Sequence, residues 1–406
     1  MSRAVPEPAV AAVEDRRTRR RLRADARPRR VAARSATAWP GGLLGALVLV
    51  MAFETAVVSA GPRFQDPVAC CWALAAEDAQ TKAPGCEVLL VGDSLVKHGL
   101  APRVLNEVTG RRSWNLAVAA GPAPATEALL RRALDSGARP QAVVFDLKPG
   151  VLAGGPKFSM RYWPRVLSLA EVLALVRAAR SGSFAGELIV VAALPSFRSR
   201  HEIRGDLSAA LSGATGPLRG LNALGARHWA VNSGANLATP RAGYSGAVSE
   251  AEQKQYVSQG FAAHRVNASA SRRIAELASR NGSRAYLLLP PTVSKLMERR
   301  VETGAERKYE AFVRSLQAEH PLLTVLDARG SGYPPSAFVD PVHLSALGAW
   351  ALSEDVALVL RKDLDSTGTM LGGRWLRLPE YRERALPDDL EHVELSRARL
   401  IESRAR

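Results

Sequence analysis

The stretch "EVLLVGDSLVKHGL", residues 87–100, decides how the rest of the sequence is interpreted. Its apolar run ends at Gly92, which is typical of a strand buried on both faces of a parallel sheet. Asp93 and Ser94 follow at once and open a helical stretch. Sites in open parallel sheets form beyond the carboxyl ends of the strands, where the Ser94 hydroxyl would act as a nucleophile. A serine here also serves as a helix cap, so the motif alone leaves both interpretations open.

Apolar runs alternate with helical patterns along the chain, which predicts an α/β protein with a parallel sheet covered on both faces. Five runs are expected to form strands: 87–91, 113–118, 142–147, 284–290 and 323–328. Long helices are expected near 249–281, 293–319 and 345–361. We therefore expect one main domain over residues 86–362.

Three segments do not fit this alternation. The stretch between the third and fourth strands is too long for one crossover, so residues 148–250 are expected to form an insertion that acts as a cap or lid. Residues 61–85 are expected to be a juxtamembrane linker. The densely charged residues 363–406 are expected to be a solvated helix or a disordered tail.

The N-terminal part of the chain predicts a membrane anchor. Residues 1–38 contain eleven Arg and four acidic residues and form an expected cytoplasmic tail. Residues 39–60 are apolar and long enough to span a bilayer as a signal anchor, with Glu54 near the far headgroups. Because positive charge stays on the cytoplasmic side, we expect the domain outside the cytoplasm, in the periplasm or at the cell surface. A signal peptide cleaved after Ala60 is the alternative.

Charge and cysteine content narrow the function classes. The formal net charge is +16, of which residues 1–38 carry +7, which leaves +9 on the remainder. That remainder lacks basic residues interleaved with aromatic ones, so no nucleic-acid partner is expected. Cys70, Cys71 and Cys86 do not have the spacing of a metal site, and no metal or other cofactor is expected. In an exported domain, two of these three cysteines can form a disulfide.

A second motif stands near the other end of the domain, in "FVDPVHLSALGAWAL", residues 338–352. Asp340 and His343 are three residues apart, after the last expected strand and just before a helix. A serine nucleophile needs a base, and the base needs an acid that orients it. We expect Ser94 as nucleophile, His343 as base and Asp340 as its partner. Two alternatives are weaker: Asp340 as a mere helix cap, and His98, which has no acidic partner, as the base.

The motifs Gly92-Asp93-Ser94-Leu95 and Asp340-Pro341-Val342-His343-Leu344 resemble the first and last blocks of the SGNH, or GDSL, hydrolases in order, distance and strand context. The resemblance covers roughly residues 86–362. It implies a flavodoxin-like three-layer fold with a parallel five-stranded sheet in the order 2-1-3-4-5. It also implies ester hydrolysis or acyl transfer through an acyl-enzyme, with the triad described above.

Two further blocks of that family match less well. The resemblance implies an oxyanion hole made by the backbone amides of Ser94 and Gly121, with Ala120 as the strictly aligned alternative. The Asn of the third block is missing, because the third expected strand continues as "FDLKPGVL". Loss of one such donor reduces the rate by ~10²–10³ in enzymes built around it.

The weak third block and the N-terminal anchor are similar to a membrane-anchored subset of SGNH proteins that move acyl groups on envelope polymers. The likeness implies an acyl ester or an acylated envelope carbohydrate as substrate, and a membrane-bound acyltransferase as a partner. Asp93, Asn115 and Lys148 are candidate substrate contacts on their positions in the chain. Asn115 is also a candidate substitute for the missing Asn, but a structural place at the strand edge is the favoured interpretation. For Lys148 the favoured interpretation is a solvated residue at a strand end. The alternative is an SGNH-fold module that is catalytically weak or inactive and binds an envelope polysaccharide.

Overall fold

The computed structural model describes residues 41–213, 218–257, 260–366 and 373–405. The Arg-rich segment 1–38 lies outside the described residues. The chain divides into two units, residues 1–50 and 51–406, and each is considered by itself.

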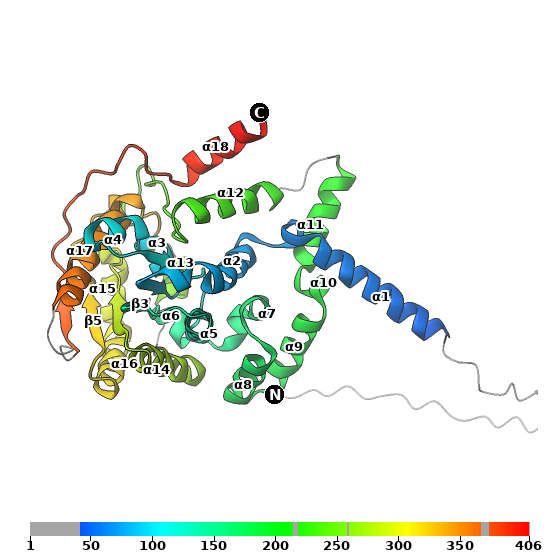
Figure 1. Cartoon of the computed structure of the whole chain (residues 1–406), viewed down its shortest axis with the longest axis horizontal. Coiled ribbons are helices and arrows are strands. Elements are labelled where there is room, and N and C mark those ends of the chain that lie inside the picture. The colour runs from blue at the N-terminus through cyan, green and yellow to red at the C-terminus, as the bar shows by residue number, and fades with distance from the viewer. Residues whose placement is uncertain (1–40, 214–217, 258–259, 367–372, 406) are drawn as a thin grey trace, which may run out of the picture. The chain divides into compact units, whose positions relative to one another are not determined.

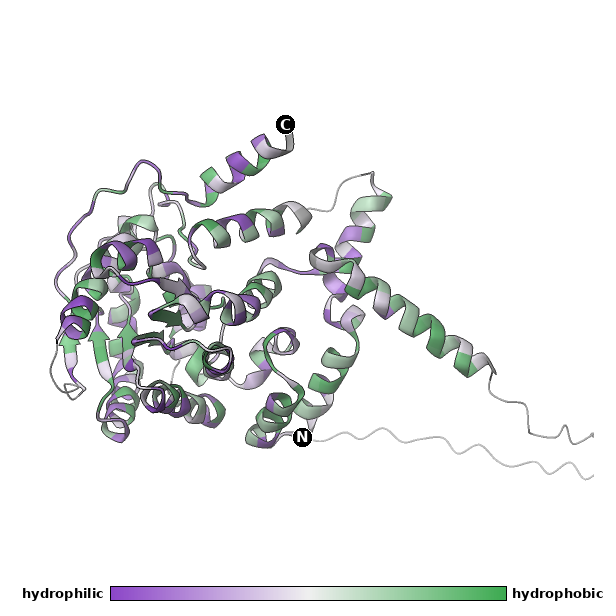
Figure 2. Cartoon of the chain, viewed as in Figure 1, coloured by the Kyte–Doolittle hydropathy of each residue, from purple (hydrophilic) through white to green (hydrophobic). Residues whose placement is uncertain are grey.

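One helix near the N-terminus, α1 (Gly41–Ser59), is long and apolar enough to cross a membrane. Figure 2 shows that hydrophobic residues predominate along this helix. Its position agrees with the span expected at 39–60, although a signal sequence has the same length and composition. The Glu54 carboxylate, expected near lipid headgroups, accepts a hydrogen bond from the Ser196 amide at 2.7 Å and another from the Ser196 hydroxyl.

The centre of the second unit is a parallel sheet of six strands in the order β2-β1-β3-β4-β5-β6. The strands are β1 (Val88–Val91), β2 (Ser113–Asn115), β3 (Ala142–Asp146), β4 (Arg284–Leu289), β5 (Thr324–Asp327) and β6 (Trp375–Arg377). The parallel α/β architecture and the order of the first five strands confirm the prediction. The expected number of five strands was wrong, because β6 pairs with β5.

Alternate residues of each strand point to opposite faces, and each face carries its own core of buried side chains. Leu89 and Phe145 belong to one core, and Leu90 and Val144 belong to the other. The first core is covered by α2 (Pro67–Thr81), α5 (Ala123–Asp135), α14 (Arg265–Arg280) and α16 (Ala305–Glu319). The second is covered by α3 (Ser94–Gly99), α4 (Pro102–Thr109), α15 (Ser294–Glu302) and α17 (Ala346–Asp365).

The segment 61–85 is more than the expected linker. Its helix α2 begins at Pro67, where the Asp66 side chain accepts a hydrogen bond from the Ala69 amide. Trp72 is fully buried in the first core, and its indole N–H donates to the carbonyl oxygen of Ala119 at 2.9 Å. The segment therefore belongs to the folded domain. Cys70, Cys71 and Cys86 are all free thiols.

The insertion after β3 is helical. Before α14 it contains α6 (Pro149–Ala153), α7 (Trp163–Val166), α8 (Leu169–Ala179), α9 (Gly182–Ala193), α10 (Pro195–Arg198), α11 (Arg200–Leu211), α12 (Leu218–Val231) and α13 (Glu250–Tyr256). Trp163 and Leu188 are fully buried in the first core, so this part extends the domain. The helices expected as single elements near 249–281 and 293–319 are each divided in two. The second break lies at Gly304, whose φ is +71°.

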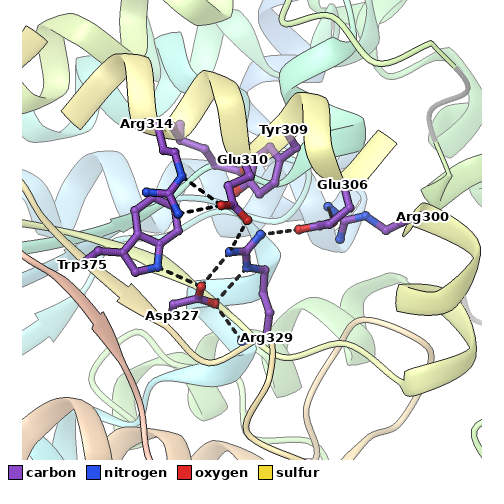
Figure 3. A network of polar contacts seen from close by, with 9 residues as sticks. Arg300, Glu306, Tyr309, Glu310, Arg314, Asp327, Arg329 and Trp375 are labelled. Carbon is purple, nitrogen blue, oxygen red and sulfur yellow. Dashed lines mark hydrogen bonds and ion pairs between the residues drawn. The ribbon is translucent and has the colours of Figure 1, made fainter. Parts of the chain in front are cut away.

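The charged C-terminal segment supplies β6 and the helix α18 (Val393–Ala405). A network of polar contacts joins β6 to β5 and to α16 (Figure 3). The Trp375 indole N–H donates to Asp327 at 3.0 Å, and the Arg314 guanidinium lies 4.3 Å from the Trp375 ring centre. Arg329 pairs with Asp327 and also with Glu306 of α16. These contacts correct the expectation that residues 363–406 are only a solvated or disordered tail.

Candidate active site

Ser94 stands at the start of α3, directly after β1, because two neighbours shape the turn. Gly92 has φ +144°, and a Cβ there would lie 1.9 Å from an Asp146 carboxyl oxygen, so only glycine fits. The Asp93 carboxylate caps α3 by accepting a hydrogen bond from the Leu95 amide at 2.7 Å. Asp93, not Ser94, is therefore the N-cap of α3, and the Ser94 hydroxyl can make other contacts.

The loop between β5 and α17 carries the second motif to the same sheet edge. One carboxyl oxygen of Asp340 accepts hydrogen bonds from the amides of Val342 and His343, each at 2.9 Å. The other lies 2.6 Å from His343 Nδ1. His343 Nε2 lies 2.8 Å from Ser94 Oγ, across 249 residues of sequence. The structure therefore brings together the three residues expected to form a triad.

The electrostatics around Asp340 favour a base at His343. Burial acts to raise the pKa of Asp340, but the hydrogen bond and charge of His343, together with two amide hydrogen bonds, lower this pKa to about 2. An ionised Asp340 fixes the proton on Nδ1 of His343, because only a donor satisfies that oxygen. Nε2 is then free to accept the proton of Ser94. The side chains are arranged for general-base activation of a hydroxyl.

His98 is not placed to compete with His343 as the base. Its ring packs beside the His343 ring, with 5.1 Å between the centres. Burial, followed by the nearby His343 and Lys97, lowers the pKa of His98 well below its ordinary value. Nε2 of His98 faces Asn236 of the insertion at 3.5 Å, and no hydrogen bond reaches its Nδ1 from the described residues. His98 is therefore a neutral ring that packs against the His343 imidazole.

Lys148 lies closer to the Ser94 hydroxyl than the sequence suggested. It follows β3, and its Nζ donates to Ser94 Oγ at 3.4 Å. The ammonium also lies 5.1 Å from the ring centre of Tyr256, on α13 of the insertion. Burial, followed by the charges of Asp340 and Glu252, raises the pKa of Tyr256 to about 12, so the phenol stays neutral. Ser94 itself is only 6% exposed. Sequence reasoning missed Tyr256, because the insertion carries no motif.

The expected oxyanion donor Gly121 has another partner in this conformation. Its amide donates to the carbonyl oxygen of Val118 at 3.1 Å and closes a tight turn. A Cβ at Gly121 would lie 2.5 Å from the Val118 side chain and 3.2 Å from the Gly92 carbonyl oxygen. Close packing against Val118 and Gly92, near Ser94, therefore explains why position 121 is a glycine. Ala120 has φ +56°, and its amide has no acceptor among the described residues.

Asn115 and Asp93, two candidate substrate contacts, are buried and hydrogen-bonded to the backbone around α3. Asn115 is fully buried, and its amide group donates to the carbonyl oxygens of Val96 and Leu100 at 3.0 and 3.1 Å. Asp93 is 2% exposed and caps α3. Both side chains hold α3, which agrees with the structural interpretation favoured for Asn115.

A buried carboxyl that the sequence did not single out lies beneath the Ser94 turn. Asp146 ends β3, and its carboxyl accepts a hydrogen bond from the Asp93 amide at 2.8 Å. Burial, followed by the charge of Asp93, raises the pKa of Asp146 well above its ordinary value. Asp146 therefore holds its proton more tightly than an exposed Asp does, and its carboxyl supports the Ser94 turn. The sequence feature that could have identified Asp146 is an acidic residue at the end of a buried apolar strand.

Comparisons with known proteins add no relative. No protein-family model matches the chain, and no curated protein is similar to it in sequence. Within the described residues, no group of three or more His, Cys, Asp or Glu side chains is placed to hold a metal ion.

Proposed function

We propose that this chain is a membrane-anchored serine esterase or O-acyltransferase of SGNH type that acts outside the cytoplasm. One observation carries the proposal: the Asp340–His343–Ser94 relay, with contacts of 2.6 and 2.8 Å, at the carboxyl edge of a parallel sheet. The strand order β2-β1-β3-β4-β5 and the two sequence motifs support the family assignment. A sixth strand is an addition to the five-stranded sheet that the resemblance implies.

The proposed reaction follows from the three side chains. His343 Nε2 takes the proton of Ser94 as Oγ attacks the carbonyl carbon of an acyl ester. The tetrahedral intermediate collapses to an acyl-enzyme, and His343 returns the proton to the departing alcohol oxygen. Water or a sugar hydroxyl then attacks the acyl carbon, again with His343 as base, and Ser94 is restored. Asp340 stabilises the imidazolium in each step.

The developing oxyanion needs donors that the missing Asn does not supply. The amides of Ser94 and Ala120 and the ammonium of Lys148 are the groups that support stabilisation of this charge. Lys148 follows β3, as the Asn of the family's third block does. An ammonium would therefore replace a neutral amide as a donor in this chain.

The proposed substrate is an acyl ester or an acylated envelope carbohydrate, and a membrane-bound acyltransferase is the proposed partner. The apolar helix α1 supports the proposed single-pass anchor. The alternative, a catalytically weak or inactive module that binds an envelope polysaccharide, is favoured by one observation. The Gly121 amide, expected as an oxyanion donor, already donates to Val118.

A fluorophosphonate probe distinguishes the two functions. We expect the full chain to be labelled, and labelling to be lost in Ser94→Ala and strongly slowed in His343→Gln. Ser345→Ala is a matched control, because Ser345 lies beside the same loop and its hydroxyl donates to the Ser336 carbonyl oxygen. Absence of labelling in a folded wild-type protein would favour the binding module. Labelling that persists in Ser94→Ala would refute Ser94 as the nucleophile.

A further inference from the structure

A cavity of about 200 Å³ lies outside the candidate active site, between α2, α3 and α12. The helices α2 and α12 pack side by side along it (Figure 1). Most of its lining is apolar, including Leu74, Leu224 and the Trp229 ring. Ser94 and His343 do not line it, so the cavity is separate from the triad.

Lys97 is a basic residue in the otherwise mostly apolar lining of this cavity. The side chain is 6% exposed, and its Nζ donates to the carbonyl oxygen of Gly234 at 3.3 Å. The same atom lies 3.9 Å from the centre of the Trp229 ring. The Cys71 thiol, which also lines the cavity, is a third partner of this ammonium through a hydrogen bond, and none of the three partners is a carboxylate.

No counter-charge accompanies this ammonium. The cavity lining contains no Asp or Glu, and Lys97 forms no ion pair within the described part of the chain. His228, which also lines the cavity, is neutral because burial, and then the charge of Lys97, lower its pKa to about 4. Burial raises the pKa of the Cys70 thiol, which therefore also stays uncharged.

Burial, the largest cause, lowers the pKa of Lys97, although the charge of Cys71 and its hydrogen bond act to raise this pKa. An anion that enters the cavity would stabilise the charged form of Lys97 in this buried place. We propose that the cavity is a binding site for a small carboxylate with an apolar body, whose carboxylate pairs with Lys97. A cavity of about 150 Å³ holds benzene, so a cavity of this size fits a carboxylate of about six carbons.

Hexanoate is the probe for this site, and hexanamide is its uncharged counterpart of the same shape. Binding is measured by titration calorimetry with the full chain in phospholipid nanodiscs, and empty nanodiscs serve as the blank. We expect hexanoate to bind and hexanamide to bind about tenfold or more weakly, because a charge-assisted contact is lost. Equal affinity for the two, or no binding of hexanoate, would overturn the proposal.

Two variants locate the site. Lys97→Met removes the charge and is expected to reduce hexanoate affinity at least about tenfold. Gly225→Phe leaves Lys97 in place and fills the cavity, because Gly225 lines it and a Cβ there meets no atom within 4 Å. It is expected to abolish binding. Gly220→Phe is the matched control, since Gly220 lies on the same helix with equally open space but does not line the cavity.

The readout is independent of the proposed esterase activity. Ser94→Ala is expected to bind hexanoate with wild-type affinity, because Ser94 does not line the cavity. Binding that is lost in Ser94→Ala but kept in Gly225→Phe would place hexanoate at the triad and overturn the proposal. If Lys97→Met does not fold, Gly225→Phe alone tests whether hexanoate binds in the cavity. Retention of wild-type affinity in folded Gly225→Phe would refute the cavity site.

Discussion

A single carboxylate, that of Asp340, organises both the backbone of its loop and the ring of His343. One oxygen accepts the amides of Val342 and His343, and the other faces His343 Nδ1. Asparagine retains the first function, because its carbonyl oxygen accepts the same amides. It cannot retain the second, because its NH₂ group would face Nδ1 as a donor and favour the wrong tautomer.

We therefore expect Asp340→Asn to fold normally and to lose most of its turnover, by up to ~10⁴ as in the serine-protease case. The measurement is hydrolysis of a short acyl ester by the full chain, with the melting temperature as a test of folding. If Asp340 were only a helix cap, Asn would serve about as well. Near-normal turnover in the folded variant would remove Asp340 from the mechanism.

Lys148 gives a second prediction at the scale of one residue. Its Nζ lies 3.4 Å from Ser94 Oγ, where an oxyanion donor would otherwise be missing. Lys148→Met should reduce kcat by ~10–10³ with a smaller change in KM, because the contact strengthens as negative charge develops. Lys157→Met is the control, since Lys157 is an exposed lysine of the same insertion that pairs with Glu187. A change confined to KM would make Lys148 a substrate contact only.

Among the elements, long buried strands were predictable and short mixed ones were not. The run that ends at Val91 has four buried apolar residues, and its length and composition are those of a buried strand. The strand β6 has three residues, "WLR", inside a dense mixture of charges. Its identity as a strand depends on pairing with β5 and on the Trp375 contacts, which are distant in sequence.

The same limit applies to the site. Ser94, Asp340 and His343 could be predicted because each follows a strand in a motif with a chemical logic. Asn236 and Tyr256 could not, because the fold of a long insertion decides which of its side chains reach His98 and Lys148. The position of Lys148 after β3 was evident from the sequence, but its contact with Ser94 was not, because a lysine at a strand end is most often solvated.

The contacts of Trp375 predict how firmly β6 is held. Trp375→Ala removes the indole hydrogen bond to Asp327 and the ring beneath Arg314, and should cost about 2 kcal/mol of unfolding free energy. Trp375→Phe keeps a ring but no N–H, and should cost about 1 kcal/mol. Urea unfolding of both variants checks the order. Wild-type stability in Trp375→Ala would mean that β6 contributes little to the sheet.

The helix α17 carries a carboxyl whose ionisation opposes folding. Burial raises the pKa of Asp355 to about 6, although Arg384 acts to lower it. Because the folded state holds this proton more tightly than the unfolded state, stability is lost as pH rises from about 4 to about 6. Asp355→Asn should raise the melting temperature by roughly 1–3 °C at pH 8 and change it little at pH 4. A gain at pH 4 instead would contradict the shifted pKa.

At the scale of the whole molecule, the proposed function requires a particular topology. Residues 1–38 carry a net charge of +7, and the uncharged stretch 35–53 follows. The positive-inside rule then places the N-terminus in the cytoplasm and residues beyond α1 outside. An envelope polymer would be accessible to Ser94 only in that orientation. The apolar helix permits either orientation, so the distribution of Arg alone carries this expectation.

Protease protection tests the topology directly. In spheroplasts of a Gram-negative host that expresses the chain with an N-terminal and a C-terminal tag, added protease should remove the C-terminal tag and spare the N-terminal one. Both tags should disappear after lysis, which controls for intrinsic resistance. Replacing the Arg residues of 1–38 by Gln should weaken the preference, because it removes the charge that retains this segment inside. Protection of the C-terminal tag in intact spheroplasts, with loss after lysis, would place the triad in the cytoplasm and exclude an envelope substrate.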